Sequence, residues 1–80
     1  MLGIGTSKIM QPSQIAHSDP EILGGTPVFV GTRVPIQTLL VYLEKGETID
    51  AFLDNFPSVT REQVIAFLEE AGRALLARIA

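Results

Sequence analysis

The chain has 80 residues and no cysteine, so we expect one small domain without disulfide bonds or thiolate metal sites. Hydrophobic residues make up 46% and charged residues 19%, a balance that excludes intrinsic disorder. The net charge of −3 argues against a strong, non-specific hold on nucleic acid, which usually needs a basic domain. Because so small a domain is only marginally stable, we expect support from a second subunit.

The first part of the chain mixes glycine, serine, glutamine and threonine with scattered isoleucines, which predicts a flexible arm over residues 1–18. A single domain then covers residues 19–80, beginning with turn signals at Asp19-Pro20 and Gly24-Gly25. No apolar run exceeds five residues, against roughly 18–20 for a membrane span, and the start shows no signal-peptide pattern. We therefore expect a cytoplasmic protein without a membrane partner.

A short β-hairpin is predicted over residues 27–35, because two extended segments flank Gly31-Thr32 and glycine suits the first central position of a type II′ turn. The predicted register places two pairs opposite each other: Phe29 with Val34, and Val30 with Arg33. Pro27 and Pro35 cannot donate ladder hydrogen bonds, so the arms are short or lie at an edge. Since an isolated hairpin is marginal in water, we expect it to pair with another element, such as its copy in a second chain.

Three helices are predicted in the second half of the chain, over about residues 36–45, 49–55 and 60–80. Each carries apolar residues at positions i, i+3, i+4 and i+7, which line one helical face. Gly46 suits the end of the first helix, and Thr48 suits the N-cap of the second. Thr60 and Gln63 form a capping box for the third. The predicted core includes Phe52 and Phe67.

The connections between these helices are short, and three apolar faces linked this tightly predict a compact, mainly α-helical unit. Two helices joined by a tight turn, with a third helix behind them, form a helix-turn-helix. The spacing alone fits a helix-turn-helix and any other small three-helix bundle equally well, so both remain open.

A catalytic set is hard to assemble from this composition. The single histidine, His17, lies in the predicted arm, and histidine is the commonest general base near neutral pH. Glu69 and Glu70 are adjacent on a helix and point about 100° apart, so they do not share a site. The glycines lack the spacing and the lysine of a phosphate loop. We expect no enzyme, no cofactor and no metal.

The start of the third helix is the candidate DNA-reading element, because that end of a recognition helix meets base edges. It offers Ser58, Thr60, Arg61, Gln63 and Ala66. Arginine pairs with guanine edges and glutamine with adenine. Glu62, Glu69 and Glu70 would repel phosphate, and an ordinary solvated surface with Gln63 occupied in its capping box stays open as the alternative.

A second group of apolar residues lies off the core faces, and residues 74–79 are apolar over too much of the helix circumference for a solvated helix. In so small a domain this surplus indicates an interface, with extra core as the alternative. Together with the hairpin, the predicted dimer or partner interface comprises Phe29, Val30, Arg33, Val34, Val41, Tyr42, Ile65, Leu76 and Ile79.

Four short motifs, at residues 19–28, 31–35, 46–49 and 56–60, resemble the domain of unknown function 433 family, and the resemblance covers about residues 14–72. It implies a three-helix homeodomain-like helix-turn-helix bundle with a short N-terminal β-hairpin. It also implies a bacterial or archaeal antitoxin-like protein whose gene often lies beside one for a PIN-like nuclease toxin. Thr60, Arg61 and Gln63 match the start of the family's recognition helix.

The sequence therefore leads to the hypothesis of a homodimeric antitoxin that binds a PIN-like nuclease toxin and, weakly, its own operator DNA. Burial of apolar surface would occlude the toxin, and basic residues of the toxin would supply the phosphate contacts that this chain lacks. The alternative is a dimeric protein-interaction or assembly module that does not bind DNA.

Overall fold

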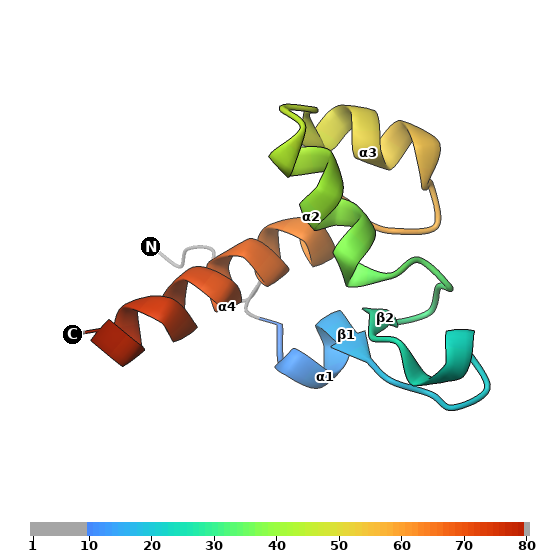
Figure 1. Cartoon of the computed structure of the whole chain (residues 1–80), viewed down its shortest axis with the longest axis horizontal. Coiled ribbons are helices and arrows are strands. Elements are labelled where there is room, and N and C mark those ends of the chain that lie inside the picture. Colours follow the sequence, from blue (N-terminus) through green and yellow to red (C-terminus); the bar gives the residue numbers. More distant parts are fainter. Residues whose placement is uncertain (1–9, 80) are drawn as a thin grey trace, which may run out of the picture.

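The computed structural model describes residues 10–79, and this part of the chain is mainly helical (Figure 1). The elements follow in this order: α1 (Pro12–Ile15), β1 (Ala16–His17), the short 3-10 helix η2 (Leu23–Gly25), β2 (Val28–Phe29), α2 (Ile36–Glu44), α3 (Ile49–Asn55) and α4 (Arg61–Ile79). The mainly helical fold with a small sheet that the sequence predicts is thus confirmed. Within residues 10–79, none of the helices has the length and apolar character that crossing a membrane requires.

The small sheet pairs β2 with β1 in antiparallel orientation, with Ala16 opposite Phe29. On the other side of β2, Val28 forms a bridge to Pro35, and the Phe29 amide donates to the Val34 carbonyl (3.0 Å). The predicted register of the first hairpin pair is therefore confirmed. The expected pairing of this strand with a second chain is replaced by pairing with β1, which supplies the missing neighbour from the same chain.

The turn of the hairpin lies one residue earlier than predicted. The Thr32 amide donates to the Phe29 carbonyl (3.0 Å), which closes a four-residue turn over residues 29–32. Gly31 occupies the third position of this turn with a φ of +81°, where a type II turn requires glycine. Thr32 is buried, and its hydroxyl donates to the Phe29 carbonyl (2.8 Å) and accepts the Val34 amide (3.0 Å). The prediction of a two-residue type II′ turn was wrong.

The hydrogen bonds of the Val30 backbone explain why the predicted type II′ turn does not form. The Val30 amide donates to the Ile15 carbonyl (3.0 Å), and its carbonyl accepts a hydrogen bond from Gln63 Nε2 (2.9 Å). The backbone groups that would have paired with Arg33 are therefore used by α1 on one side and by α4 on the other. The predicted pair of Val30 with Arg33 was wrong because tertiary partners outcompete the local turn.

The predicted flexible arm contains ordered structure in its second half, since α1 and β1 both fall within residues 10–18. Pro12 stands at the start of α1, and Ile15 at its end is buried where α1 packs against α4. Residues 1–9 of the predicted arm lie outside the described residues. The boundary at residue 18 therefore does not separate an arm from the domain, because α1 and β1 belong to the packed unit.

The helices begin and end where their capping residues predict. At the end of α2, the Glu47 amide donates to the Tyr42 carbonyl (2.9 Å), and Gly46 adopts a φ of +84°, as in a Schellman motif. The Thr48 hydroxyl accepts the Ala51 amide (3.0 Å) at the start of α3. These local bonds fix where α2 turns into α3.

The core gathers under α2, α3 and the first half of α4. Phe29, Leu39, Phe52 and Val64 are fully buried, and the Phe29 ring lies edge-on to Phe67 (6.4 Å between centroids). The predicted core position of Phe52 is confirmed, while Phe67 is half-buried against this cluster. Strand β2 thus joins the sheet to the helices through one aromatic side chain.

Candidate interaction surfaces

The two halves of α4 lie in different surroundings. Residues 61–70 include the buried Gln63 and Val64, whereas every residue from Ala71 to Ile79 is exposed. Figure 1 shows the second half extending away from α2 and α3. This half therefore presents its side chains to the surroundings of the molecule.

An apolar stripe runs along α4, formed by Ile65, Leu68, Gly72, Leu75 and Ile79, with Leu76 beside it. The exposed fractions are 57% for Leu75, 64% for Leu76 and 71% for Ile79. A shallow depression lies over Gly72 between Leu68 and Leu76. Ile65, Leu76 and Ile79 were predicted as interface residues, and the structure places them together on this one exposed face.

Other predicted interface residues lie elsewhere. Phe29 is fully buried in the core and Val34 is only 9% exposed, so neither offers much surface to an interface. Tyr42 is half-buried and packs its ring against Phe52 of the core (5.5 Å between centroids). The half-buried Val30 and Val41 and the exposed Arg33 are distant in sequence from the stripe. The apolar character of a residue did not reveal which of these side chains are already covered.

The predicted DNA-reading residues also divide into two groups. Ser58, Thr60 and Arg61 are exposed, and Ala66 is half-buried. Gln63 is only 6% exposed. Its side-chain Nε2 donates to the Val30 carbonyl in the hairpin turn, its backbone amide donates to Thr60 Oγ1 (3.0 Å), and its Oε1 accepts the Thr60 amide (3.1 Å). The capping box is confirmed, and the assignment of Gln63 to base contact is wrong because its side chain is buried and fully engaged.

Arg61 is held by a carboxylate of the neighbouring helix. Its guanidinium forms an exposed ion pair with Asp50 of α3. Glu62 and Glu69 line the same shallow groove as Arg61 and Ile65. The surface around the start of α4 is therefore acidic, and a phosphate at this place would compete with Asp50 for the single cation.

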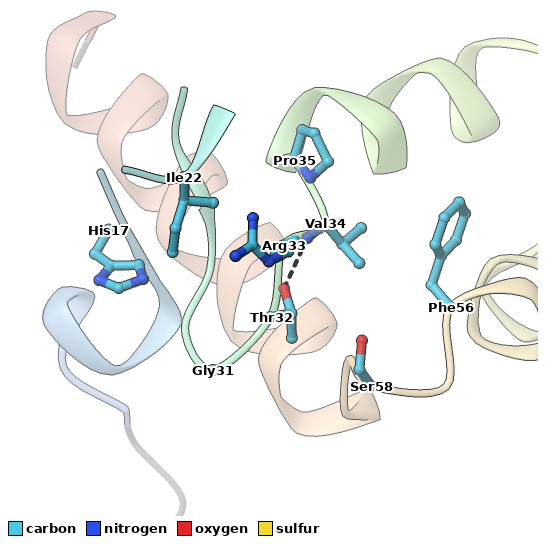
Figure 2. Close-up of a pocket in the computed structure, with 9 residues that line it drawn as sticks. All are labelled: His17, Ile22, Gly31, Thr32, Arg33, Val34, Pro35, Phe56 and Ser58. Atoms are coloured by element: carbon cyan, nitrogen blue, oxygen red, sulfur yellow. Dashed lines mark hydrogen bonds between the residues drawn. The ribbon is translucent and has the colours of Figure 1, made fainter. Parts of the chain in front are cut away.

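A second depression lies beside the hairpin and was not predicted from the sequence. Figure 2 shows the residues that line it: His17, Ile22, Gly31, Thr32, Arg33, Val34, Pro35, Phe56 and Ser58. Pairing of β1 with β2 brings His17 to the same depression as Arg33, and the loop before α4 adds Ser58. Sequence spacing held no signal for this grouping, because the β1–β2 contact that creates it was not predicted.

Within residues 10–79, no group of three or more His, Asp or Glu side chains lies close enough together to bind a metal ion. Among those same residues, both Arg61 and Arg73 are engaged by carboxylates, the latter by Glu70 (2.8 Å). Among the described residues, the two depressions and the apolar stripe are therefore the candidate interaction surfaces.

Comparison with known proteins places this fold in a family. The model of the family "Protein of unknown function (DUF433)" matches residues 17–71, from β1 into α4. The "Uncharacterized protein y4eO" of Sinorhizobium fredii is 39% identical over 51 residues, which are 64% of this chain but only 23% of that relative's length. No solved structure matches the chain significantly. Because the family match covers more than half of the chain, this protein belongs to the DUF433 family.

Proposed function

We propose that this chain is the antitoxin of a toxin–antitoxin pair and that it binds a PIN-like nuclease toxin through the apolar stripe of α4. The exposure of Leu75, Leu76 and Ile79 carries this proposal. An exposed apolar row on a small domain is typical of a protein–protein interaction site. Burying it against the toxin would stabilise both partners of the complex.

Charge supports a basic partner. The chain carries a net charge of −3, and the start of α4 adds Glu62 and Glu69 to an acidic groove. A nuclease cleft that binds RNA attracts negative charge, and complementary potentials speed association and disfavour wrong partners. An acidic antitoxin would therefore also compete with RNA for the toxin.

DNA binding is the second part of the proposal. We infer a homeodomain-like helix-turn-helix in which α3 and α4 form the motif and the start of α4 meets the DNA. Ser58, Thr60, Arg61 and Ala66 remain as contact residues after Gln63 is removed from the set. With only six Lys and Arg residues, the chain neutralises few phosphates, so we expect weak operator binding that strengthens when the toxin adds its own cations.

A protein-interaction module that does not bind DNA is the second candidate. The ion pair between Arg61 and Asp50 favours it, because the one cation in the first two turns of α4 already has a partner. Both candidates share the stripe on α4 as the binding surface. They differ only in whether the chain also binds operator DNA.

The test uses the product of the neighbouring gene. The parent chain should form a complex with it and lower its cleavage of RNA. Leu75→Lys should lose both effects, because a charge is placed in the stripe, whereas Ala74→Lys should keep them. Ala74 is exposed and lies about 100° or more around the helix from every residue of the stripe, so it is a matched control. A neighbouring product that neither binds the parent nor cleaves RNA contradicts the antitoxin proposal.

A further inference from the structure

We propose that a second copy of this chain covers the apolar stripe of α4 when no other partner is present, with the two α4 helices packed antiparallel. This inference goes beyond the proposed function, because it concerns the chain alone and needs neither toxin nor DNA. It rests on three features of α4: the spacing of its apolar residues, the glycine at their centre, and the segregation of charge along the helix.

The spacing of the stripe is that of a two-helix seam. Its members, Ile65, Leu68, Gly72, Leu75 and Ile79, alternate separations of three and four residues, which is the a/d pattern of a coiled coil. The row spans about 21 Å at 1.5 Å per residue. Leu68 lies partly against the core of its own chain, while the members from Gly72 onward are exposed. A second helix of the same sequence fits the exposed part of this row.

Gly72 sits at the centre of the seam. A Cβ built at this position meets nothing within 4 Å, so the fold of the single chain does not require glycine there. Glycine also weakens a helix interior relative to alanine. The depression over Gly72, which Leu68 and Leu76 line together with Glu69, Arg73 and Ala77, instead has the form of a hole that accepts a leucine from a facing helix.

Charge decides the orientation. Residues 61–70 carry one arginine and three glutamates, a net charge of −2, whereas residues 71–79 carry Arg73 and Arg78 and no acid, a net charge of +2. An antiparallel pair sets Glu69 and Glu70 of each copy beside the basic half of the other, and it does so twice by symmetry. A parallel pair would set like charges together along the whole length, which disfavours association.

The same gradient also suits an isolated helix, since acids near the N-terminus and bases near the C-terminus complement the helix dipole. The dipole, however, has no bearing on Leu75 and Ile79, which remain exposed in the single chain. A facing helix of the same sequence accounts for the apolar row and the charge gradient together.

The register follows from the hole at the centre. If Leu75 of the second copy enters the hole over Gly72, then Leu68 lies level with Ile79 of the second copy, because both pairs are separated by four residues along their helices. The pairs of Leu68 with Ile79 and of Gly72 with Leu75 then each occur twice by symmetry, while Ile65 lies outside the overlap of the two helices. One helix face holds one partner at a time, so toxin binding to the stripe would require this dimer to open.

Sedimentation of the purified chain tests the self-association. At micromolar concentration the parent should show twice the monomer mass. Ile79→Lys should raise the dissociation constant of the dimer by more than about tenfold, because it places a charge in the seam. Ala74→Lys, with the same added charge outside the stripe, should sediment like the parent. A parent that remains monomeric overturns the proposal whether or not a toxin is found.

A charge reversal tests the same helix without touching the apolar row. Arg78→Glu should weaken the dimer, since the basic half then loses its charge, and the loss should shrink at high salt. Arg33→Glu makes the same change in net charge beside the hairpin, where it should leave the dimer intact. A dimer that responds to Arg33→Glu and not to Arg78→Glu would instead be formed by the hairpin surface.

Cross-linking tests the orientation, and the absence of native cysteines makes the result unambiguous. Leu68→Cys and Ile79→Cys variants are mixed and oxidised. The antiparallel register brings these positions to one level, so the mixed disulfide should predominate. In a parallel pair they would lie about 16 Å apart along the axis, beyond the reach of a disulfide. Predominance of the two homodisulfides would therefore overturn the antiparallel arrangement.

Discussion

The first and second halves of α4 follow one apolar pattern but have different neighbours. In the first half, Val64 is fully buried and Phe67 packs against Phe29 of the sheet. In the second half the same spacing continues through Leu75 and Ile79, and both are exposed. Hydrophobic periodicity therefore identifies the apolar face of a helix, but it does not say whether other parts of the chain cover that face.

Helix lengths explain the difference. The α2 helix has nine residues and α4 has nineteen, so at 1.5 Å per residue α2 is about 13 Å long and α4 about 28 Å. The neighbours of α4 are too short to cover both halves. Within residues 10–79, the apolar residues of the second half therefore remain exposed.

The largest expected effect comes from comparing a core residue beneath the first half of α4 with an exposed residue on its second half. Phe52→Ala should destabilise the domain by about 3–5 kcal/mol, because a fully buried aromatic ring is removed. For so small a domain this approaches the whole free energy of unfolding. Leu75→Ala should change it by less than about 0.5 kcal/mol in dilute, monomeric protein. Denaturant unfolding measures both, and similar values for the two variants would contradict the assignment of buried and exposed faces.

The next effect concerns the hydrogen bond that joins the first half of α4 to the turn of the hairpin. Gln63→Ala removes half of a capping box and leaves the Val30 carbonyl without its Gln63 donor, so we expect a loss of about 1–3 kcal/mol in unfolding free energy. Gln14 is the matched control, because it occupies the same place in the exposed capping box of α1. Gln14→Ala should cost less than about 1 kcal/mol. Equal losses would mean that the hydrogen bond to Val30 contributes nothing to stability.

Local sequence signals predicted the helical part of the fold well. The residues that cap the helices, Thr48, Thr60 and Gly46, act through bonds to near neighbours in the chain, so their patterns determine α3, the start of α4 and the end of α2. The core position of Phe52 followed from the apolar period in the same way. These features need no knowledge of the tertiary arrangement.

The sheet and the sites depend on contacts that are distant in sequence. The bond between Gln63 and Val30 joins α4 to the turn of the hairpin, and it both excludes the predicted turn and removes Gln63 from the surface. The two-residue strand β1 carries too little pattern to be recognised before its partner is known. For the same reason the depression lined by both His17 and Arg33 could not be predicted from the sequence.

Substitutions of two glycines, Gly72 in α4 and Gly46 at the end of α2, should change the free energy of unfolding by about 1 kcal/mol in opposite directions. Gly72→Ala should stabilise the dilute monomer by about 1 kcal/mol, because a Cβ at this helical position meets nothing within 4 Å. Gly46→Ala should destabilise it by a similar amount, since the φ of +84° suits glycine alone. Thermal unfolding measures both changes. A destabilising Gly72→Ala would show that the single chain itself needs the close approach at this position.

The smallest effect on folding is expected at the start of α4, where the question is function. Arg61→Ala removes an exposed ion pair with Asp50, so the free energy of unfolding should change by no more than about 0.5 kcal/mol. If Arg61 contacts a base in the operator, its loss should cost about 1–3 kcal/mol of binding free energy, whereas a phosphate contact would mainly lower the salt dependence.

Asp50→Asn is the informative companion, because it frees the arginine and should strengthen operator binding. Titration of an operator fragment at two salt concentrations, with and without the neighbouring gene's product, measures these changes. Unchanged affinity in both variants would exclude Arg61 as a DNA contact, and no binding by the parent under any of these conditions would favour the interaction module that does not bind DNA.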